Sequence, residues 1–267
     1  MLVYIYDGSF PGLLTAIYES YYRREKPEEI LAQDQWQHTL FAQEVVIKTD
    51  EKKADKVYQA IKDKISGFAA RNAYCVFLAE VPGAEMLIYN YLSRGWKLGA
   101  KLDFHLADEA VLQVHTVAKK VRQEAHRMLG LVRFRLLKHE LYYAQIEPDH
   151  NILQMISPHF ARRMADQNWM IHDVKRGLAA VYNQVEWVLT PLERPKTISL
   201  NETGLFYESL WQKYFSSIAI KSRKNLRLQR SFLPKRYWKH LVEMDESRSR
   251  FAESSVLSPQ SPVKTYK

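Results

Sequence analysis

A single apolar stripe runs along residues 108–129. Its members recur at spacings of three and four, the pattern of one amphipathic helix, and they are Val111, Val114, Ala118, Val121, Ala125 and Met128. Asp108 can cap the start of this helix, and Gly130 stands where a left-handed terminating residue is expected. Directly afterwards the apolar period changes to two, which predicts strands. A chain with both patterns in succession must combine helices with a sheet.

The period-two segments predict the strands of that sheet. Residues 131–136 and 141–146 flank Lys138-His139-Glu140, so we expect a β-hairpin. Ser157-Pro158 predicts a short helix, with Ser as its cap and Pro in its first turn, ending near Gln167. Three more strands are predicted at 169–174, 178–182 and 185–189. A helix between two strand pairs implies an antiparallel sheet covered on one face, so the predicted fold class is α+β.

The first 130 residues are predicted to be rich in helix. The apolar periodicity indicates helices after Pro11, from Asp50 and across 70–91, with a break near Pro82-Gly83. Between them the sequence predicts strands at 3–6 and 42–48 and a polar loop at 25–37. We therefore expect a core of residues 1–190, helical over 1–130 and sheet-containing over 131–190. An aromatic and basic helical segment, 191–245, would pack on this core, and 246–267 would form a disordered tail.

Composition limits the cellular setting. No apolar run approaches the roughly 18–20 residues of a membrane helix, and the first ten residues lack the basic start and cleavage site of a signal peptide. The one cysteine, Cys75, excludes a disulfide framework and a cysteine-based zinc or iron–sulfur site. We expect a soluble cytoplasmic protein with no membrane association, no metal and no cofactor.

The charge of the chain, +9, is concentrated near its end. Residues 1–220 carry 27 basic and 26 acidic side chains, whereas residues 221–267 carry 12 and 4. Basic side chains among aromatics suit phosphate contact and base stacking. The predicted nucleic-acid-binding residues here are Lys221, Arg223, Lys224, Arg227, Arg230, Lys235, Arg236, Tyr237, Trp238 and Lys239. The alternative is a solvated helical face whose apolar residues dock onto the rest of the chain.

A second group of polar residues lies between positions 124 and 176. His159 would occupy the second position of the short helix, where unpaired backbone N–H groups can bind an anion. Together with Asp173 it forms the candidate catalytic pair, one group able to transfer a proton and the other a carboxylate. The candidate phosphate-binding side chains of this group are Arg127, Arg133, Arg162, Arg163 and Arg176, and Glu124 and His126 are further polar candidates.

Structural roles compete with these functional ones. A histidine near a helix C-terminus, such as His126, can complement the helix dipole. Asp173 and Arg176 can form an ion pair that holds a turn. No glycine-rich phosphate loop, nucleophile elbow or metal-binding histidine pair occurs in the sequence.

Several of these residues resemble a known family. The ordered series is Glu124-Ala125-His126-Arg127-Met128, Gly130, Arg133-Phe134, Tyr142-Tyr143-Ala144, Pro148-Asp149, His159-Phe160 with Arg163, then Trp169, Ile171 and Asp173 with Arg176. It is similar to a bacterial family of DNA metabolism and repair proteins, a domain of unknown function of the DUF4130 type. Residues 6–10 resemble the opening of that family, and residues 234–239 resemble its closing segment.

The resemblance implies a partner enzyme. Family members are fused to uracil-DNA-glycosylase-like domains or encoded beside a radical SAM protein of DNA modification or repair. Because Cys75 cannot supply a three-cysteine cluster motif, any iron–sulfur chemistry would belong to the partner. The resemblance supplies no established catalytic residues.

Three functions follow from these observations. The first is a DNA-binding accessory protein in repair or modification that acts with a radical SAM or glycosylase-type partner. The second is an enzyme that acts directly on nucleic acid through a His/Asp/Arg site. The third is a protein–protein adaptor whose basic segment docks on an acidic partner.

Overall fold

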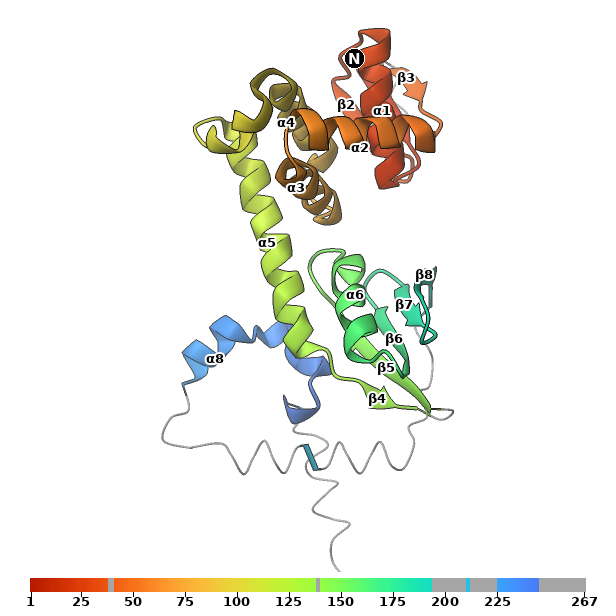
Figure 1. The fold of residues 1–267 in the computed structure, drawn as a ribbon, viewed down its shortest axis with the longest axis vertical. Helices are drawn as coiled ribbons and strands as arrows, with labels where there is room; N and C mark the ends of the chain where they lie inside the picture. The colour runs from red at the N-terminus through yellow and green to blue at the C-terminus, as the bar shows by residue number, and fades with distance from the viewer. Residues whose placement is uncertain (38–40, 138–139, 194–209, 212–224, 245–267) are drawn as a thin grey trace, which may run out of the picture. The chain divides into compact units, whose positions relative to one another are not determined.

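The structure is a computed structural model that describes residues 1–37, 41–137, 140–193, 210–211 and 225–244 (Figure 1). It contains helices and two separate sheets, so the predicted α+β class is confirmed. The chain divides into two units, which are described separately below. The N-terminal unit comprises residues 1–125 and 149–152, and the C-terminal unit comprises 126–148 and the residues from 153 onward. The predicted tail, 246–267, lies outside the described residues.

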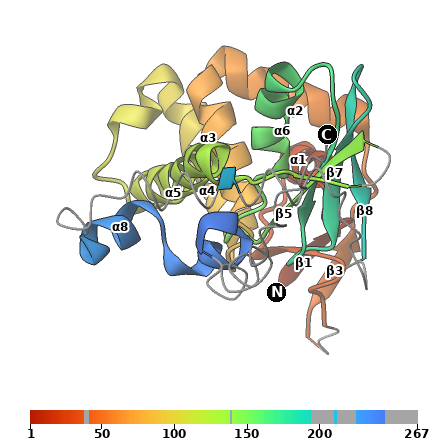
Figure 2. The same ribbon diagram turned by 90° about the horizontal axis from the view of Figure 1, so that it is seen from below.

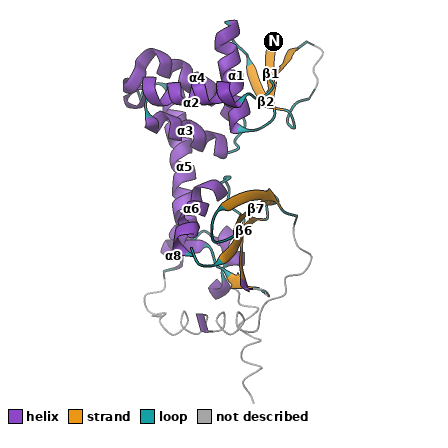
Figure 3. Ribbon diagram, turned by 45° about the vertical axis from the view of Figure 1, so that its right-hand side comes forward, coloured by secondary structure: helices purple, strands orange, loops and turns teal. Residues whose placement is uncertain are grey.

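A three-stranded parallel sheet begins the N-terminal unit (Figure 3). Strand β1 (Leu2–Tyr6) lies at the centre, between β2 (Glu29–Ala32) and β3 (Gln43–Val46). The predicted strands at 3–6 and 42–48 are confirmed as β1 and β3. The loop predicted at 25–37 is wrong at β2, which lies within it. Ile30 and Ala32 are buried beside β1, so pairing with a buried strand outweighs the polar composition of this segment.

Among the described residues, four α-helices and one short 3₁₀ helix lie wholly within the N-terminal unit. They are α1 (Phe10–Arg23), α2 (Glu51–Lys64), α3 (Gly67–Leu78), α4 (Ala84–Leu98) and η1 (Gly99–Phe104). The predicted start of α2 is confirmed, since the Asp50 carboxylate accepts a hydrogen bond from the Lys53 backbone at 3.1 Å. Gly83 separates α3 from α4 with a positive φ of 76°, a conformation that glycine adopts at little cost.

The long helix predicted from residue 108 is α5 (Glu109–Leu131), which belongs to the first unit up to Ala125 and to the second from His126. Asp108 caps it by accepting from the Ala110 backbone at 2.9 Å. The predicted stripe is confirmed, because its residues are buried. Gly130 does not end the helix: it keeps a negative φ, and the Val132 N–H still bonds to the Met128 carbonyl at 3.1 Å.

The C-terminal unit contains a five-stranded sheet in the order β4-β5-β6-β7-β8. Three of its strands, β5, β7 and β8, can be followed in Figure 2. The bounds are β4 (Arg135–Leu136), β5 (Leu141–Ile146), β6 (Asn168–Asp173), β7 (Leu178–Tyr182) and β8 (Trp187–Pro191). The predicted hairpin is present, although its first arm is only two residues long because α5 extends further than expected.

One strand pair departs from the predicted antiparallel arrangement. Strands β5 and β6 run parallel, whereas the other three neighbouring pairs are antiparallel. The helix α6 (Leu153–Arg163) connects β5 to β6 and carries the chain back to the same end of the sheet, as a parallel pair requires. The helix contacts β6, β7 and β8. Trp169 is fully buried in this unit, where its ring stacks on Tyr182 at 5.2 Å between centroids.

Candidate nucleic-acid interface

The basic segment, defined here as residues 225–244, is the described part of the positively charged C-terminal region. It consists of α8 (Leu226–Phe232), η4 (Lys235–His240) and η5 (Val242–Met244). The side chain of Asn225 caps α8 by accepting from the Leu228 backbone at 3.0 Å. Five cationic residues of the segment are exposed, and they are Arg227, Arg230, Lys235, Arg236 and Lys239. The predicted residues Lys221, Arg223 and Lys224 lie outside the described residues.

Of the three aromatic residues of this segment, Tyr237 and Trp238 are covered or partly covered, whereas Phe232 on α8 is 71% exposed. Tyr237 is only 3% exposed, and Leu241 and Val242 beside it are also buried. Trp238 is half-buried and donates its indole N–H to the Leu233 carbonyl at 2.9 Å. The Arg236 guanidinium lies over the Tyr237 ring, 4.8 Å from its centroid. The segment therefore offers mainly cations to a ligand, with Phe232 as its one largely exposed ring.

Arg133 fastens the basic segment. Its guanidinium bonds to Glu243 at 2.6 Å and to the Gly130 carbonyl at 2.7 Å, and it lies 5.8 Å from the Trp211 ring centroid. Burial by itself would raise the pKa of Glu243, but the hydrogen bonds from Arg133 and Trp211 outweigh it and hold that pKa below its usual value. Arg133, predicted to bind phosphate, is therefore engaged by a carboxylate of the same unit.

A second ion pair ties the segment to the sheet. The Lys239 ammonium pairs with Glu147, which follows β5, and His240 lies 3.4 Å from the same carboxylate. In the described part of the chain, Arg227, Arg230 and Lys235 form no ion pair. Those three cations are consequently the ones most available to an external anion.

The position of His159 differs from the prediction. Helix α6 begins at Leu153, six residues earlier, so His159 is not near the free backbone N–H groups of a helix start. Pro158 sits inside the helix, and Ser157 donates to the Leu153 carbonyl at 2.7 Å instead of capping. Burial of the apolar face through Phe160 outweighs the hydrogen bond that proline removes. The His159 ring meets the Phe160 ring edge to face at 5.1 Å.

Arg162 and Arg163 are exposed in the last turn of α6, where cations complement the helix dipole. His126 and Arg127 are exposed on α5, within the same unit. These four side chains therefore lie at the surface, as phosphate-binding residues must. Their role in phosphate binding stays a prediction.

Asp173 is fully buried at the end of β6. Its carboxylate accepts from the Lys175 and Arg176 backbones at 3.1 and 3.3 Å and pairs with the Arg176 guanidinium at 2.8 Å. Arg176 also donates to the Pro148 carbonyl at 3.1 Å. Burial raises the pKa of Asp173 despite the opposing effect of Arg176. This geometry holds the turn between β6 and β7, and a catalytic role for Asp173 with His159 stays a prediction.

Glu124 belongs to the N-terminal unit and is buried on α5. Its carboxylate accepts from the backbones of Asp149 and His150 at 2.8 and 2.9 Å and also binds the Nδ1 atom of His150. The carboxylate orients the imidazole, so Glu124 and His150 form a carboxylate–histidine pair. Sequence reasoning found Glu124 but missed His150. The available signal was a carboxylate beside the apolar stripe, which needs buried hydrogen-bond donors.

The comparison with protein families bears on this region. A family model for a domain of unknown function, DUF4130, matches residues 82–243. The chain belongs to this family. The DUF4130 region begins just before α4 and ends in the basic segment, so it contains every predicted site residue that the structure describes. The similarity noted at residues 6–10 lies before this region and stays a prediction, as does the association with a radical SAM or glycosylase-like partner.

No protein with a curated description matches the chain. Within the described residues, no three His, Cys, Asp or Glu side chains gather closely enough to hold a metal ion. Among the helices that the structure describes, none combines the length and apolarity needed to span a membrane.

Proposed function

We propose that this chain is a DNA-binding accessory protein of DNA repair or modification, which binds through its basic segment and acts with a partner enzyme. One observation carries the proposal: five cations of the basic segment are exposed, while Tyr237 is buried and holds the segment in place. The only acidic residue in this segment, Glu243, is occupied by Arg133. Such a surface recognises a run of phosphates.

Phosphate contacts dominate the affinity of proteins for duplex DNA and carry no sequence information by themselves. The proposed binding is therefore independent of sequence and weakens steeply with salt. This suits an accessory protein that holds DNA while another enzyme performs the chemistry.

The test is duplex binding by the triple variant Arg227→Gln, Arg230→Gln and Lys235→Gln. Anisotropy of a labelled 20-base-pair duplex at 100 mM salt should show affinity reduced on the order of a hundredfold, because three phosphate contacts are lost. A matched variant, Lys26→Gln, Lys101→Gln and Lys120→Gln, removes three exposed charges elsewhere. Equal affinities for the two triple variants would contradict the proposal.

The proposed partner is a radical SAM or uracil-DNA-glycosylase-like protein, as the resemblance implies. Co-purification of the tagged chain with each co-expressed candidate tests it, with and without nuclease treatment. Retention after nuclease digestion indicates direct protein contact. Loss of the partner on digestion indicates that DNA bridges the two, and no co-purification in either condition contradicts the partnership.

A further inference from the structure

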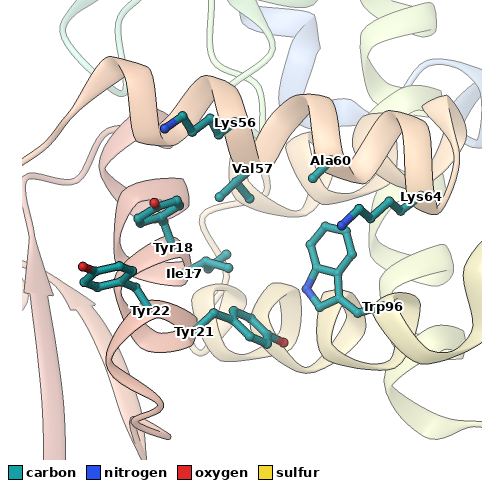
Figure 4. Close-up of a pocket in the computed structure, with 9 residues that line it drawn as sticks. All are labelled: Ile17, Tyr18, Tyr21, Tyr22, Lys56, Val57, Ala60, Lys64 and Trp96. Atoms are coloured by element: carbon teal, nitrogen blue, oxygen red, sulfur yellow. The ribbon is translucent and has the colours of Figure 1, made fainter.

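A pocket of about 530 Å³ opens in the N-terminal unit among α1, α2 and α4 (Figure 4). Ile17 and Val57, both buried, contribute its apolar base. Besides Ala60, its other apolar walls are the aromatic side chains of Tyr18, Tyr21, Tyr22 and Trp96. Except for Trp96, these residues precede the DUF4130 region, so most of the pocket lies outside the part of the chain that matches the family.

The rings of this pocket differ in how open they are, and Tyr22 is the most exposed, whereas the Lys53 ammonium lies over the Tyr18 ring, 5.7 Å from its centroid. Tyr18 and Tyr22, four residues apart on α1, have ring planes within 14° of parallel and centroids 6.1 Å apart. Figure 4 shows them on one side of the pocket, with Trp96 on the other and Tyr21 directed toward it. Tyr22 is 76% exposed and Tyr21 is 47% exposed. Two exposed and two half-buried aromatic side chains around one hollow mark an interaction site.

Hydrogen bonds fix part of this wall before any ligand arrives. The Tyr21 hydroxyl lies 2.8 Å from the Ser93 hydroxyl on α4, and the Tyr21 ring lies 6.3 Å from the Tyr89 ring. Burial raises the pKa of Tyr21, so its hydroxyl keeps its proton at neutral pH. The pocket is therefore neutral apart from its lysines.

Two lysines of α2, Lys56 and Lys64, line the same pocket. Both are exposed, and in the described part of the chain neither forms an ion pair. Lys53 differs, because Glu19 binds its ammonium at 2.7 Å. Lys64 is eight positions after Lys56, which places their backbones about 12 Å apart along the helix. Two cations at this spacing can bind two phosphates of one strand.

We propose that this pocket binds a short stretch of single-stranded nucleic acid. Bases stack on the rings of Tyr22 and Trp96, with Tyr18 supporting Tyr22 from behind, while phosphates bind Lys56 and Lys64. Open aromatic faces beside cations are the arrangement that single-strand-binding proteins use, since every base has a face to stack. In a duplex those faces are already stacked on neighbouring bases. The inference rests on the proposed function only for the class of ligand, nucleic acid, and assigns it a second and separate site.

The experiment measures binding of a labelled eight-nucleotide oligo-dT to the full chain by fluorescence anisotropy. Tyr22→Ala should weaken binding on the order of tenfold or more, because a stacking surface is lost. Phe104→Ala is the matched control, since Phe104 is also exposed in this unit but lies outside the pocket, and it should leave binding unchanged. Equal binding by wild type and Tyr22→Ala, or no binding by wild type, overturns the inference.

Two further arms identify the ligand. The variant Lys56→Gln with Lys64→Gln should weaken oligo-dT binding more than the variant Lys26→Gln with Lys101→Gln. Competition with dTMP tests whether the pocket binds a strand or a free nucleotide. If dTMP displaces the labelled oligo-dT as well as unlabelled oligo-dT does at equal molar concentration, the proposal that the ligand is a strand is overturned. Duplex affinity serves as an independent readout: Tyr22→Ala leaves it unchanged if the pocket is specific for single strands. If instead the proposed role of the basic segment in duplex binding is wrong, only the duplex affinity of the Arg227→Gln, Arg230→Gln and Lys235→Gln triple variant shows it.

Discussion

The basic segment and the aromatic pocket combine the same residue types in opposite orientations. In the basic segment, Tyr237 is buried and the cations around it are exposed. In the pocket, Tyr22 is largely exposed, and the two lysines that line it, Lys56 and Lys64, form no ion pair among the described residues. The first surface presents mainly charge, with Phe232 as its one largely exposed ring, and the second presents mainly aromatic rings with less charge.

This difference explains why composition alone misleads about the ligand. Basic and aromatic residues alternate most densely near the C-terminus, where the sequence predicts both phosphate contact and base stacking. There, Tyr237 is buried with Leu241 and Val242 and holds the segment, and Phe232 is the one largely exposed ring. The larger group of accessible rings lies on α1 and α4, where the sequence shows an ordinary helical pattern.

The largest expected effect tests the orientation of the two tyrosines. Tyr237→Ala should reduce the free energy of unfolding by about 3–5 kcal/mol, the range for truncating a buried aromatic side chain. Tyr22→Ala should change it by no more than about 0.5 kcal/mol, because the ring is mostly exposed. Urea unfolding followed by circular dichroism measures both. Similar losses for the two variants would remove the basis of the comparison.

Salt should separate the two surfaces next. If the five exposed cations of the basic segment each neutralise one phosphate, the duplex affinity falls roughly 500-fold between 50 and 200 mM salt. The two lysines of the pocket give roughly a sevenfold fall for a single strand over the same range. Anisotropy titrations at four salt concentrations give both slopes. Slopes that coincide would indicate one shared binding surface.

Arg133 provides a smaller test of how the basic segment is fastened. Arg133→Ala leaves the Glu243 carboxylate with the Trp211 indole N–H, at 3.2 Å, as its remaining side-chain donor. We expect a loss of about 2–3 kcal/mol, less than for a fully buried pair because Arg133 is partly exposed. Arg162→Ala, which removes an exposed guanidinium from α6, should stay within about 0.5 kcal/mol. The pocket's affinity for oligo-dT should remain unchanged in both variants.

Local periodicity predicted much of the fold. The stripe from Val111 to Met128 predicted α5, and the change to period two predicted the strands of the second sheet. The errors occur where tertiary packing outweighs a local signal. Strand β2 lies in a polar stretch but pairs with buried β1, and α6 begins before Pro158 because its apolar face is buried against the sheet.

The sites were less predictable, since they depend on which side chains meet. The sequence placed Glu124, Arg133 and Asp173 among candidate binding or catalytic groups. Each turns out to bond to its own unit, to His150, Glu243 and Arg176 respectively. The pocket escaped notice because its residues come from three helices, and residues 17–22 and 56–64 show only the spacing of an amphipathic helix.

Acid should affect the two surfaces differently, with the smallest effect of the series. The pKa of Glu243 is lowered in the folded chain, so the ionised carboxylate contributes its full stabilisation above the ordinary glutamate pKa. That contribution is lost as the pH falls through the depressed pKa. The difference in thermal midpoint between wild type and Glu243→Gln should therefore be largest near pH 6 and shrink toward pH 3. At the pocket, the raised pKa of Tyr21 keeps its hydroxyl protonated. The affinity of the wild type for oligo-dT should therefore stay constant from pH 6 to pH 9, and so should that of the control variant Phe104→Ala. If the difference in thermal midpoint between wild type and Glu243→Gln stays constant down to pH 3, the Arg133–Glu243 ion pair does not hold the basic segment in place.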